Sequence, residues 1–166
     1  MERLTNRYSD LYREVKDELS ILDIDKTEEC ITTYSEIPSF PGGQFSLFLV
    51  RVNLGQTLKL IKKHWDNEYD LKRFSSGIFN LDRLCIKTTT IKFSSKQQHQ
   101  YDRIIDNILT IPETLDSDGY VTLDGTDYEL KINTQKINKK YNWKMPTNEI
   151  TFLKPLIDFL ISTSRE

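Results

Sequence analysis

The clearest pattern of hydrophobic and polar positions lies between Asp118 and Ser162. Apolar and polar residues alternate over 128–132 and again over 141–145, which predicts two strands with one buried face each. Pro146 ends the second strand because proline cannot donate to a ladder of hydrogen bonds. Asp124-Gly125 is typical of a tight hairpin turn, where both central residues need positive φ. We therefore expect strands on both sides of this pair.

Helical spacing recurs at four places in the chain. In each, apolar residues stand three or four positions apart and so define one buried face. Two of these helices are also expected to begin with a capping box, formed by Asn53 with Gln56 and by Ser95 with Gln98. The four predicted helices cover residues 2–22, 54–66, 95–109 and 151–162.

Further strands are expected in the first half of the chain. Residues 45–52 (FSLFLVRV) are almost continuously hydrophobic, which predicts a central strand covered on both faces. A short strand is expected at 30–34 and another within 78–93, while 37–43 and 72–77 read as connectors rich in turn formers. Strands and helices do not alternate regularly. The sequence predicts a single α+β domain over residues 1–166, with a mainly antiparallel sheet packed by about four helices.

Composition narrows the class of protein. The chain has 166 residues, of which 29% are charged and 37% hydrophobic, as in ordinary folded domains. It contains no apolar run near the roughly 20 residues of a membrane span and begins without a secretory signal, so we expect a cytoplasmic protein with no membrane partner. Cys30 and Cys85 then read as reduced structural thiols.

Charge is distributed unevenly along the chain. The net charge is only −2 overall, although residues 1–36 hold five Lys and Arg against ten Asp and Glu. A nucleic-acid-binding domain is expected to show an overall basic excess with clustered Lys and Arg. The sequence therefore argues against a nucleic-acid partner.

Residues 23–29 (DIDKTEE) concentrate these acids, with Asp23, Asp25, Glu28 and Glu29 among them. Their mutual repulsion favours a solvated loop. The segment lacks the glycine and the length of a calcium loop, so no metal site is expected. The alternative to a plain loop is an acidic contact surface for a basic protein partner.

Aromatic residues exceed the number that the predicted helical faces need. Tyrosine and tryptophan supply large contact areas at interfaces for a small loss of side-chain entropy. Tyr69 and Phe74 are the candidate partner anchors, because both lie in a segment that reads as a charged connector.

An alternative to a protein-binding role is catalysis by a histidine and a carboxylate. His64 with Asp66 or Glu68 could form a general-base pair in a small hydrolase or nuclease. A histidine among lysines near a helix C-terminus is also explained by the helix dipole. No phosphate loop, metal-ligand spacing or nucleophile motif occurs in the sequence, so no cofactor is expected.

The last third of the chain carries a resemblance. The segments DGYVTLDGTDYELKI, YNWKMP and LKPLIDFL resemble the C-terminal half of small bacterial proteins, including immunity proteins of contact-dependent or secreted toxin systems. The resemblance implies a non-catalytic inhibitor, cytoplasmic and encoded beside its toxin. It transfers no binding residue, since such proteins contact their toxins through variable surfaces.

These observations predict a non-catalytic protein-binding module, in its specific form an immunity protein that occludes the active site of a basic toxin domain. Asp23, Asp25, Glu28 and Glu29 would steer the partner, and Tyr69 and Phe74 would anchor it. The alternatives are the hydrolase or nuclease described above and a regulatory adaptor subunit.

Overall fold

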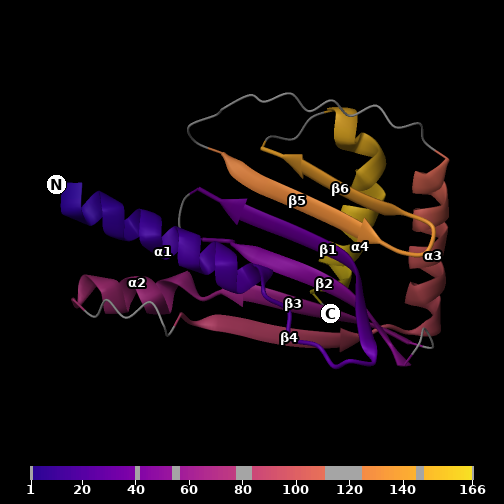
Figure 1. Cartoon of the computed structure of the whole chain (residues 1–166), viewed down its shortest axis with the longest axis horizontal. Coiled ribbons are helices and arrows are strands. Elements are labelled where there is room, and N and C mark those ends of the chain that lie inside the picture. The colour runs from indigo at the N-terminus through magenta and orange to yellow at the C-terminus, as the bar shows by residue number, and fades with distance from the viewer. Residues whose placement is uncertain are drawn as a thin grey trace.

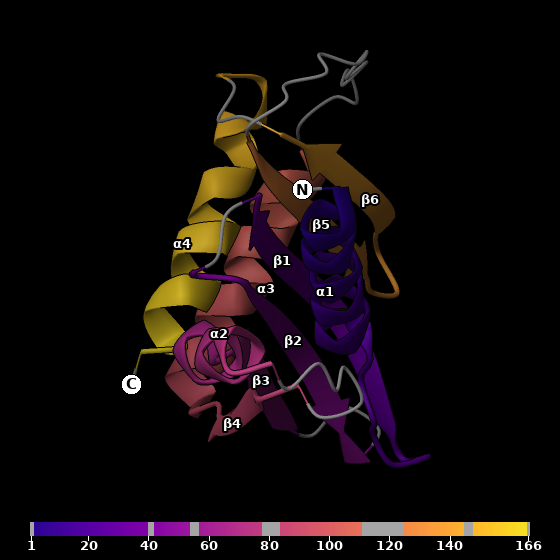
Figure 2. The ribbon, with the colours of Figure 1, turned by 90° about the vertical axis from the view of Figure 1, so that its left-hand side faces the viewer.

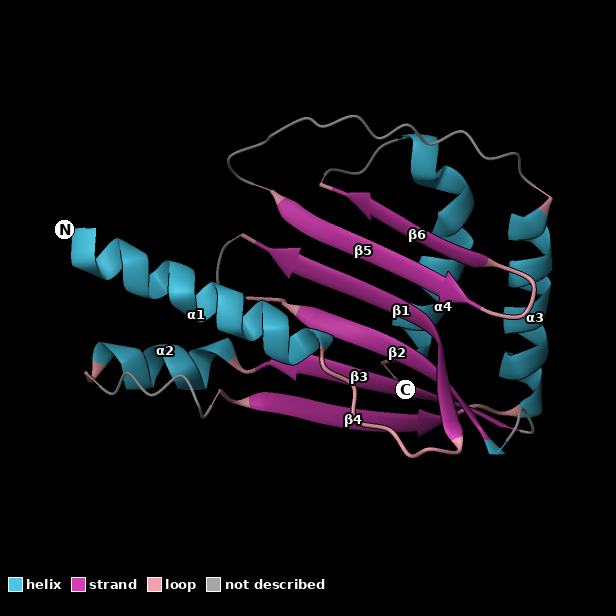
Figure 3. Cartoon of the chain, in the orientation of Figure 1, coloured by secondary structure: helices cyan, strands magenta, loops and turns pink. Residues whose placement is uncertain are grey.

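The structure is a computed structural model that describes residues 2–39, 42–53, 57–77, 84–110, 125–144 and 148–165. These residues form one six-stranded sheet with helices on both of its faces, which is an α+β architecture (Figures 1 and 3). Neighbouring strands are antiparallel throughout, as the sequence predicts. The strands are β1 (Glu28–Pro38), β2 (Phe45–Val52), β3 (Thr57–Trp65), β4 (Ile86–Lys92), β5 (Thr126–Asn133) and β6 (Asn138–Trp143).

The order of the strands is β4-β3-β2-β1-β5-β6, so β1 and β2 lie at the centre. The prediction of a central strand covered on both faces is confirmed for β2. Its Leu47 and Leu49 pack in one core cluster, while Phe48 and Val50 pack in another on the opposite face. This follows from the alternation of side chains along a strand whose two faces are both buried.

Helices α3 (Ser95–Leu109) and α4 (Lys154–Thr163) cover one face of the sheet, and α1 (Glu2–Ser20) covers the other (Figure 2). Tyr101 of α3 is buried, and its hydroxyl lies 2.7 Å from that of Thr32 on β1. The Thr32 hydroxyl already donates to the carbonyl of Ile31, so Tyr101 must be the donor of this bond. On the other face, Leu11, Val15 and Leu19 of α1 are fully buried.

The helix predicted over 54–66 is wrong. Residues 57–65 form β3, which pairs with β2 on one side and β4 on the other. The capping box predicted at Asn53 is wrong as well, because Asn53 directly follows β2 with φ of 50°, whereas an N-cap residue is extended, and the chain is again in a strand from Thr57. Asparagine tolerates this left-handed conformation better than most residues.

Part of the connector predicted over 72–77 belongs to a helix instead. Helix α2 covers Asn67–Ser75, and the side chain of Asp66 caps its first turn by accepting from the Tyr69 N–H. A carboxylate at this position satisfies an orphan N–H and complements the helix dipole. The acidic residues therefore begin a helix, where the sequence pattern had suggested the end of one.

Other boundaries differ by a few residues. The prediction of a helix over 95–109 is confirmed, but Ser94 and Gln97 form its capping box in place of Ser95 and Gln98. Helix α1 ends at Ser20, and α4 follows a short 3-10 helix, Asn148–Leu153. Strand β1 is longer than the predicted 30–34, since it runs from Glu28 through Pro38.

The turn predicted at Asp124-Gly125 falls largely outside the described residues, which resume at Gly125. The strands predicted over 128–132 and 141–145 correspond to β5 and β6, which pair with each other through the turn at 134–137. Part of the strand predicted within 78–93 is β4, and residues 78–83 lie outside the described part. Cys30 and Cys85 are free thiols.

Candidate protein-binding surface

The predicted acidic segment divides into two parts with different surroundings. Asp23 and Asp25 are exposed in the loop between α1 and β1. Glu28 and Glu29 belong to β1 and pair with cations of other strands, Glu28 with Lys59 of β3 at 2.5 Å and Glu29 with Arg51 of the adjacent β2 at 3.2 Å. The prediction that all four side chains lie in a solvated loop is therefore wrong for Glu28 and Glu29.

Glu28 has a structural role at the end of the loop between α1 and β1. Its side chain is only 8% exposed, and the hydrogen bond from Lys59 is the main cause that holds the pKa of its carboxyl below the ordinary value. Its backbone N–H donates to the carbonyl of Asp25 at 2.9 Å, while its carboxylate accepts from the Asp25 N–H at 3.4 Å. Glu28 thus fixes the loop that presents Asp25.

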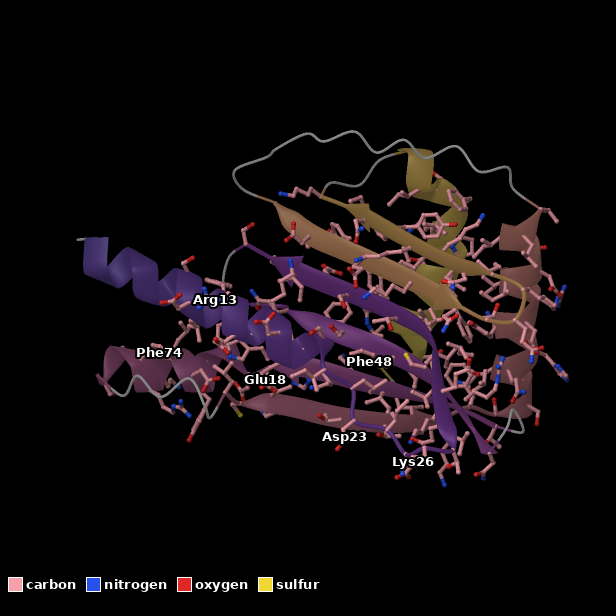
Figure 4. The ribbon with its side chains drawn as sticks, viewed as in Figure 1. Arg13, Glu18, Asp23, Lys26, Phe48 and Phe74 are labelled. Carbon is pink, nitrogen blue, oxygen red and sulfur yellow. The ribbon has the colours of Figure 1, made fainter. Side chains whose placement is uncertain are left out.

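Exposed acids continue beyond this loop onto helix α1. Asp17 and Glu18 lie on the solvent side of the last turns of α1, because Val15 and Leu19 occupy its buried side. Figure 4 shows Glu18 and Asp23 following one another along the same side of the molecule. We call Asp17, Glu18, Asp23 and Asp25 the acidic ridge.

A large aliphatic side chain interrupts the acidic ridge. Ile21 is 53% exposed, between Glu18 and Asp23 in the chain. An exposed apolar residue surrounded by charges has the composition of a small binding site, with an apolar centre and a polar rim. The predictions from sequence had placed no role on Ile21, although it falls outside the apolar helical spacing of residues 2–22.

Lys63 of β3 fixes the backbone beneath this ridge. Its ammonium donates to the carbonyl of Glu18 at 2.5 Å and to that of Ile21 at 2.9 Å. These carbonyls lie at the C-terminal end of α1, where a cation also interacts favourably with the helix dipole. Burial lowers the pKa of Lys63, while Glu18 acts in the opposite direction.

The two predicted aromatic anchors lie in different environments on α2. Tyr69 is 54% exposed, and the guanidinium of Arg73 lies 5.6 Å from the centroid of its ring. Phe74 is only 6% exposed and packs with Leu11 and Val15 of α1. The prediction that Phe74 is exposed is therefore wrong, since the amphipathic helix α2 turns it inward (labelled in Figure 4).

The two carboxylates of the catalytic alternative each pair with a lysine, whereas the buried Nδ1 of His64 has no hydrogen-bond partner among the described residues. Asp66 forms an ion pair with Lys87 at 2.5 Å, and Glu68 forms one with Lys72 at 2.7 Å. Burial, followed by the nearby charges of Lys62 and Lys87, lowers the pKa of His64. The charge of Asp66 acts on the pKa of His64 in the opposite direction, and both carboxylates are engaged by lysines.

In the described part of the chain, no group of three or more His, Cys, Asp and Glu side chains could hold a metal ion. The described helices are also too short or too polar to cross a membrane.

An aromatic group on the α3 and α4 face, with Tyr34 buried and Tyr128 and Trp143 half-buried, was not predicted as a unit. Trp143 of β6 stacks on Tyr128 of β5 with ring centroids 5.4 Å apart, and Tyr34 of β1 lies 6.5 Å from Trp143. The Tyr34 hydroxyl donates to Glu36 at 3.3 Å, and burial raises the pKa of the Glu36 carboxyl. The alternation of apolar residues along each strand predicts which face a side chain occupies. Predicting that these three aromatic rings are neighbours also requires the register between the strands, which the sequence pattern does not give.

Comparison with known proteins adds no relative: no family model, no curated protein and no solved structure matches this chain.

Proposed function

We propose that this chain is a non-catalytic protein-binding module that docks a basic partner on the acidic ridge around Ile21. The observation that carries the proposal is the exposure of Ile21 between carboxylates on a backbone held by Lys63. Clustered charge of one sign raises the rate of encounter with a surface of opposite sign. An exposed aliphatic side chain at the centre of the ridge supplies apolar surface that is removed from water when the partner binds.

Tyr69 is the second proposed contact. Tyrosine and arginine are the residue types enriched among interface residues that contribute most to affinity, and Tyr69 carries Arg73 against its ring. The contact between Tyr69 and Arg73 lies within one helix and exists before binding. Part of the side-chain entropy that both residues lose at an interface is therefore already lost in the free protein.

In its specific form, the proposal is an immunity protein that occludes the active site of a cognate bacterial toxin in the cytoplasm. Three features support it: the resemblance carried by the C-terminal segments, the exposed acids, and the engagement of Asp66 and Glu68 in ion pairs. A regulatory adaptor would bind in the same way and differ only in the identity of its partner.

The experiment uses the product of the adjacent gene. The chain is co-expressed with that product, the complex is isolated, and its affinity and stoichiometry are measured by calorimetry. The proposal expects a one-to-one complex and protection of cells from the partner's activity.

Ile21→Ser is the test variant and Leu109→Ser the matched control. Leu109 is also exposed, at 43%, but lies on α3 away from the ridge. We expect Ile21→Ser to weaken binding about tenfold or more, as removal of a central interface side chain does, and Leu109→Ser to leave affinity unchanged. Equal effects of the two substitutions would contradict the proposed surface.

A further inference from the structure

Among the described strands, β4 is the outermost on one side of the sheet, and its middle residues are exposed on both faces. Thr88, Thr89 and Thr90 are all exposed, and β3 is the neighbour of β4 in the strand order. Figure 3 shows β4 along the lower border of the sheet. Such a strand presents unpaired backbone groups that can pair with another strand.

Two hydrogen bonds fix which backbone groups face outward. The Phe93 N–H donates to Leu58, and the Asp66 N–H donates to Cys85. Phe93 lies opposite Leu58 and Cys85 opposite Asp66 in the same register that places Thr89 opposite Lys62. Thr89 is an even number of residues from both Phe93 and Cys85. In an antiparallel pair the bonding residues alternate, so Thr89 bonds inward to β3 and the backbone groups of Thr88 and Thr90 point outward.

We propose that two copies of this chain associate through antiparallel pairing of their β4 strands about a two-fold axis at Thr89. Thr88 of each copy then exchanges backbone hydrogen bonds with Thr90 of the other. The two Thr89 residues lie directly opposite each other in the non-hydrogen-bonded position, with Cα atoms about 4.5 Å apart. The two sheets become one continuous sheet in the dimer.

The charge pattern of β4 favours a second copy as the occupant. In this register Lys87 faces Ile91 of the other copy and Ile86 faces Lys92, so no lysine lies opposite a lysine. The centre consists of threonines, which form favourable cross-strand pairs. The other outer strand, β6, carries Lys139 and Lys140 and is followed by Lys144. Pairing β4 with β6 would instead join copies into an open chain, and sedimentation velocity distinguishes such a chain from a dimer because its mass keeps increasing with concentration.

Thr90→Pro tests the outward hydrogen bonds. Proline at this position removes an N–H that β3 does not use, and outer strands tolerate proline there. Thr90→Ala is the control, because it keeps the N–H. By sedimentation velocity over a concentration series, we expect the wild type and Thr90→Ala to dimerise. Symmetry removes two bonds per dimer in Thr90→Pro, so its dimer should be about tenfold weaker or more.

Charge substitutions at Thr89 test the two-fold axis. Thr89→Lys or Thr89→Glu places two like charges opposite each other in the dimer. Within the monomer, position 89 lies opposite Lys62 of β3, which favours the glutamate and disfavours the lysine, so the fold of each variant is measured as well. Each variant alone should be monomeric, and an equimolar mixture should form a heterodimer. Circular dichroism confirms that each variant is folded.

A wild-type chain that stays monomeric at every concentration would overturn this inference, as would a dimer unaffected by Thr90→Pro and the Thr89 substitutions. Because β4 and the acidic ridge have no residue in common, this outcome is independent of whether the adjacent gene's product binds.

Discussion

The indole N–H of Trp65 donates to the carboxylate of Asp70 at 2.8 Å, inside the protein. The same carboxylate oxygen accepts from the Cys85 N–H at 2.7 Å, and Arg73 lies 3.6 Å from the other oxygen. Asp70 is fully buried. It therefore joins the end of β3, helix α2 and the segment that leads into β4.

Asp70→Ala should strongly destabilise the fold. Removing one member of a buried charged group leaves the remaining donors without their acceptor, which costs about 3–5 kcal/mol. Chemical denaturation measures the change in the free energy of unfolding. Asp106→Ala is the control, because Asp106 forms an exposed ion pair with Lys136, and solvent screening leaves such a pair little effect on stability. Similar losses for both would contradict the role of Asp70.

Lys63→Met should weaken both the end of α1 and partner binding. Methionine keeps the length of the side chain but removes the donor to Glu18 and Ile21, a loss of about 1–3 kcal/mol in the free energy of unfolding. Lys92→Met on the exposed outer strand is the control. Hydrogen exchange should show faster exchange at the C-terminal end of α1 in Lys63→Met alone, and unchanged exchange there would exclude this contact as a support of the ridge.

Glu28 and Glu36 should contribute to stability with opposite dependence on pH. The pKa of Glu28 is lowered in the fold, mainly by the Lys59 hydrogen bond, so its contribution is present at neutral pH and lost as pH falls through the folded pKa. The pKa of Glu36 is raised by burial, so its contribution is present at low pH and lost as pH rises through the folded pKa.

The two glutamine variants separate these effects. Relative to the wild type, Glu28→Gln should be less stable at neutral pH, with a deficit that shrinks in acid. Glu36→Gln should gain stability relative to the wild type as pH rises from about 3 to 7. Urea denaturation at both pH values provides the measurement, and parallel behaviour of the two variants would contradict the assigned causes.

Asn53→Ser should discriminate between a turn and a helix cap. Serine and asparagine serve almost equally well at the start of a helix, whereas serine in the left-handed conformation of Asn53 costs about 1–2 kcal/mol. Asn53→Gly should be tolerated, since glycine adopts positive φ readily. Thermal unfolding compares the variants, and full stability of Asn53→Ser would argue against the turn.

Strands could be predicted from the sequence where the burial of each face stays the same along the strand. Strand β2 is hydrophobic on both faces because both are covered, one by α3 and α4 and the other by α1 and the segment that follows it, with Leu22 and Ile24. Strand β5 alternates because it buries Leu130 and Ile132 on one side. Strand β3 could not be predicted in this way. Its Leu58, Ile61 and Trp65 also fit helical spacing, because β3 buries residues on both faces and so loses the simple alternation of a half-buried strand.

The proposed binding surface could be predicted from the sequence only in part. The acidic composition of residues 23–29 is visible in the sequence, but Glu29 is opposite Arg51 only through the register of β1 and β2. Phe74 points inward because residues 67–75 form a helix that packs on α1, a contact between segments far apart in the chain. Such partners depend on tertiary structure, which local patterns do not contain.

The most direct measurement is the rate of association with the adjacent gene's product as a function of salt concentration. The acidic ridge is neutralised by Asp17→Asn, Glu18→Gln, Asp23→Asn and Asp25→Asn. A control with the same change in net charge neutralises exposed acids on other helices, by Glu68→Gln, Asp102→Asn, Asp106→Asn and Asp158→Asn. Steering by the ridge predicts that the first variant associates more slowly and with a weaker dependence on salt, while the control resembles the wild type. Equal rates and salt dependence in both variants would contradict the acidic ridge as the docking surface.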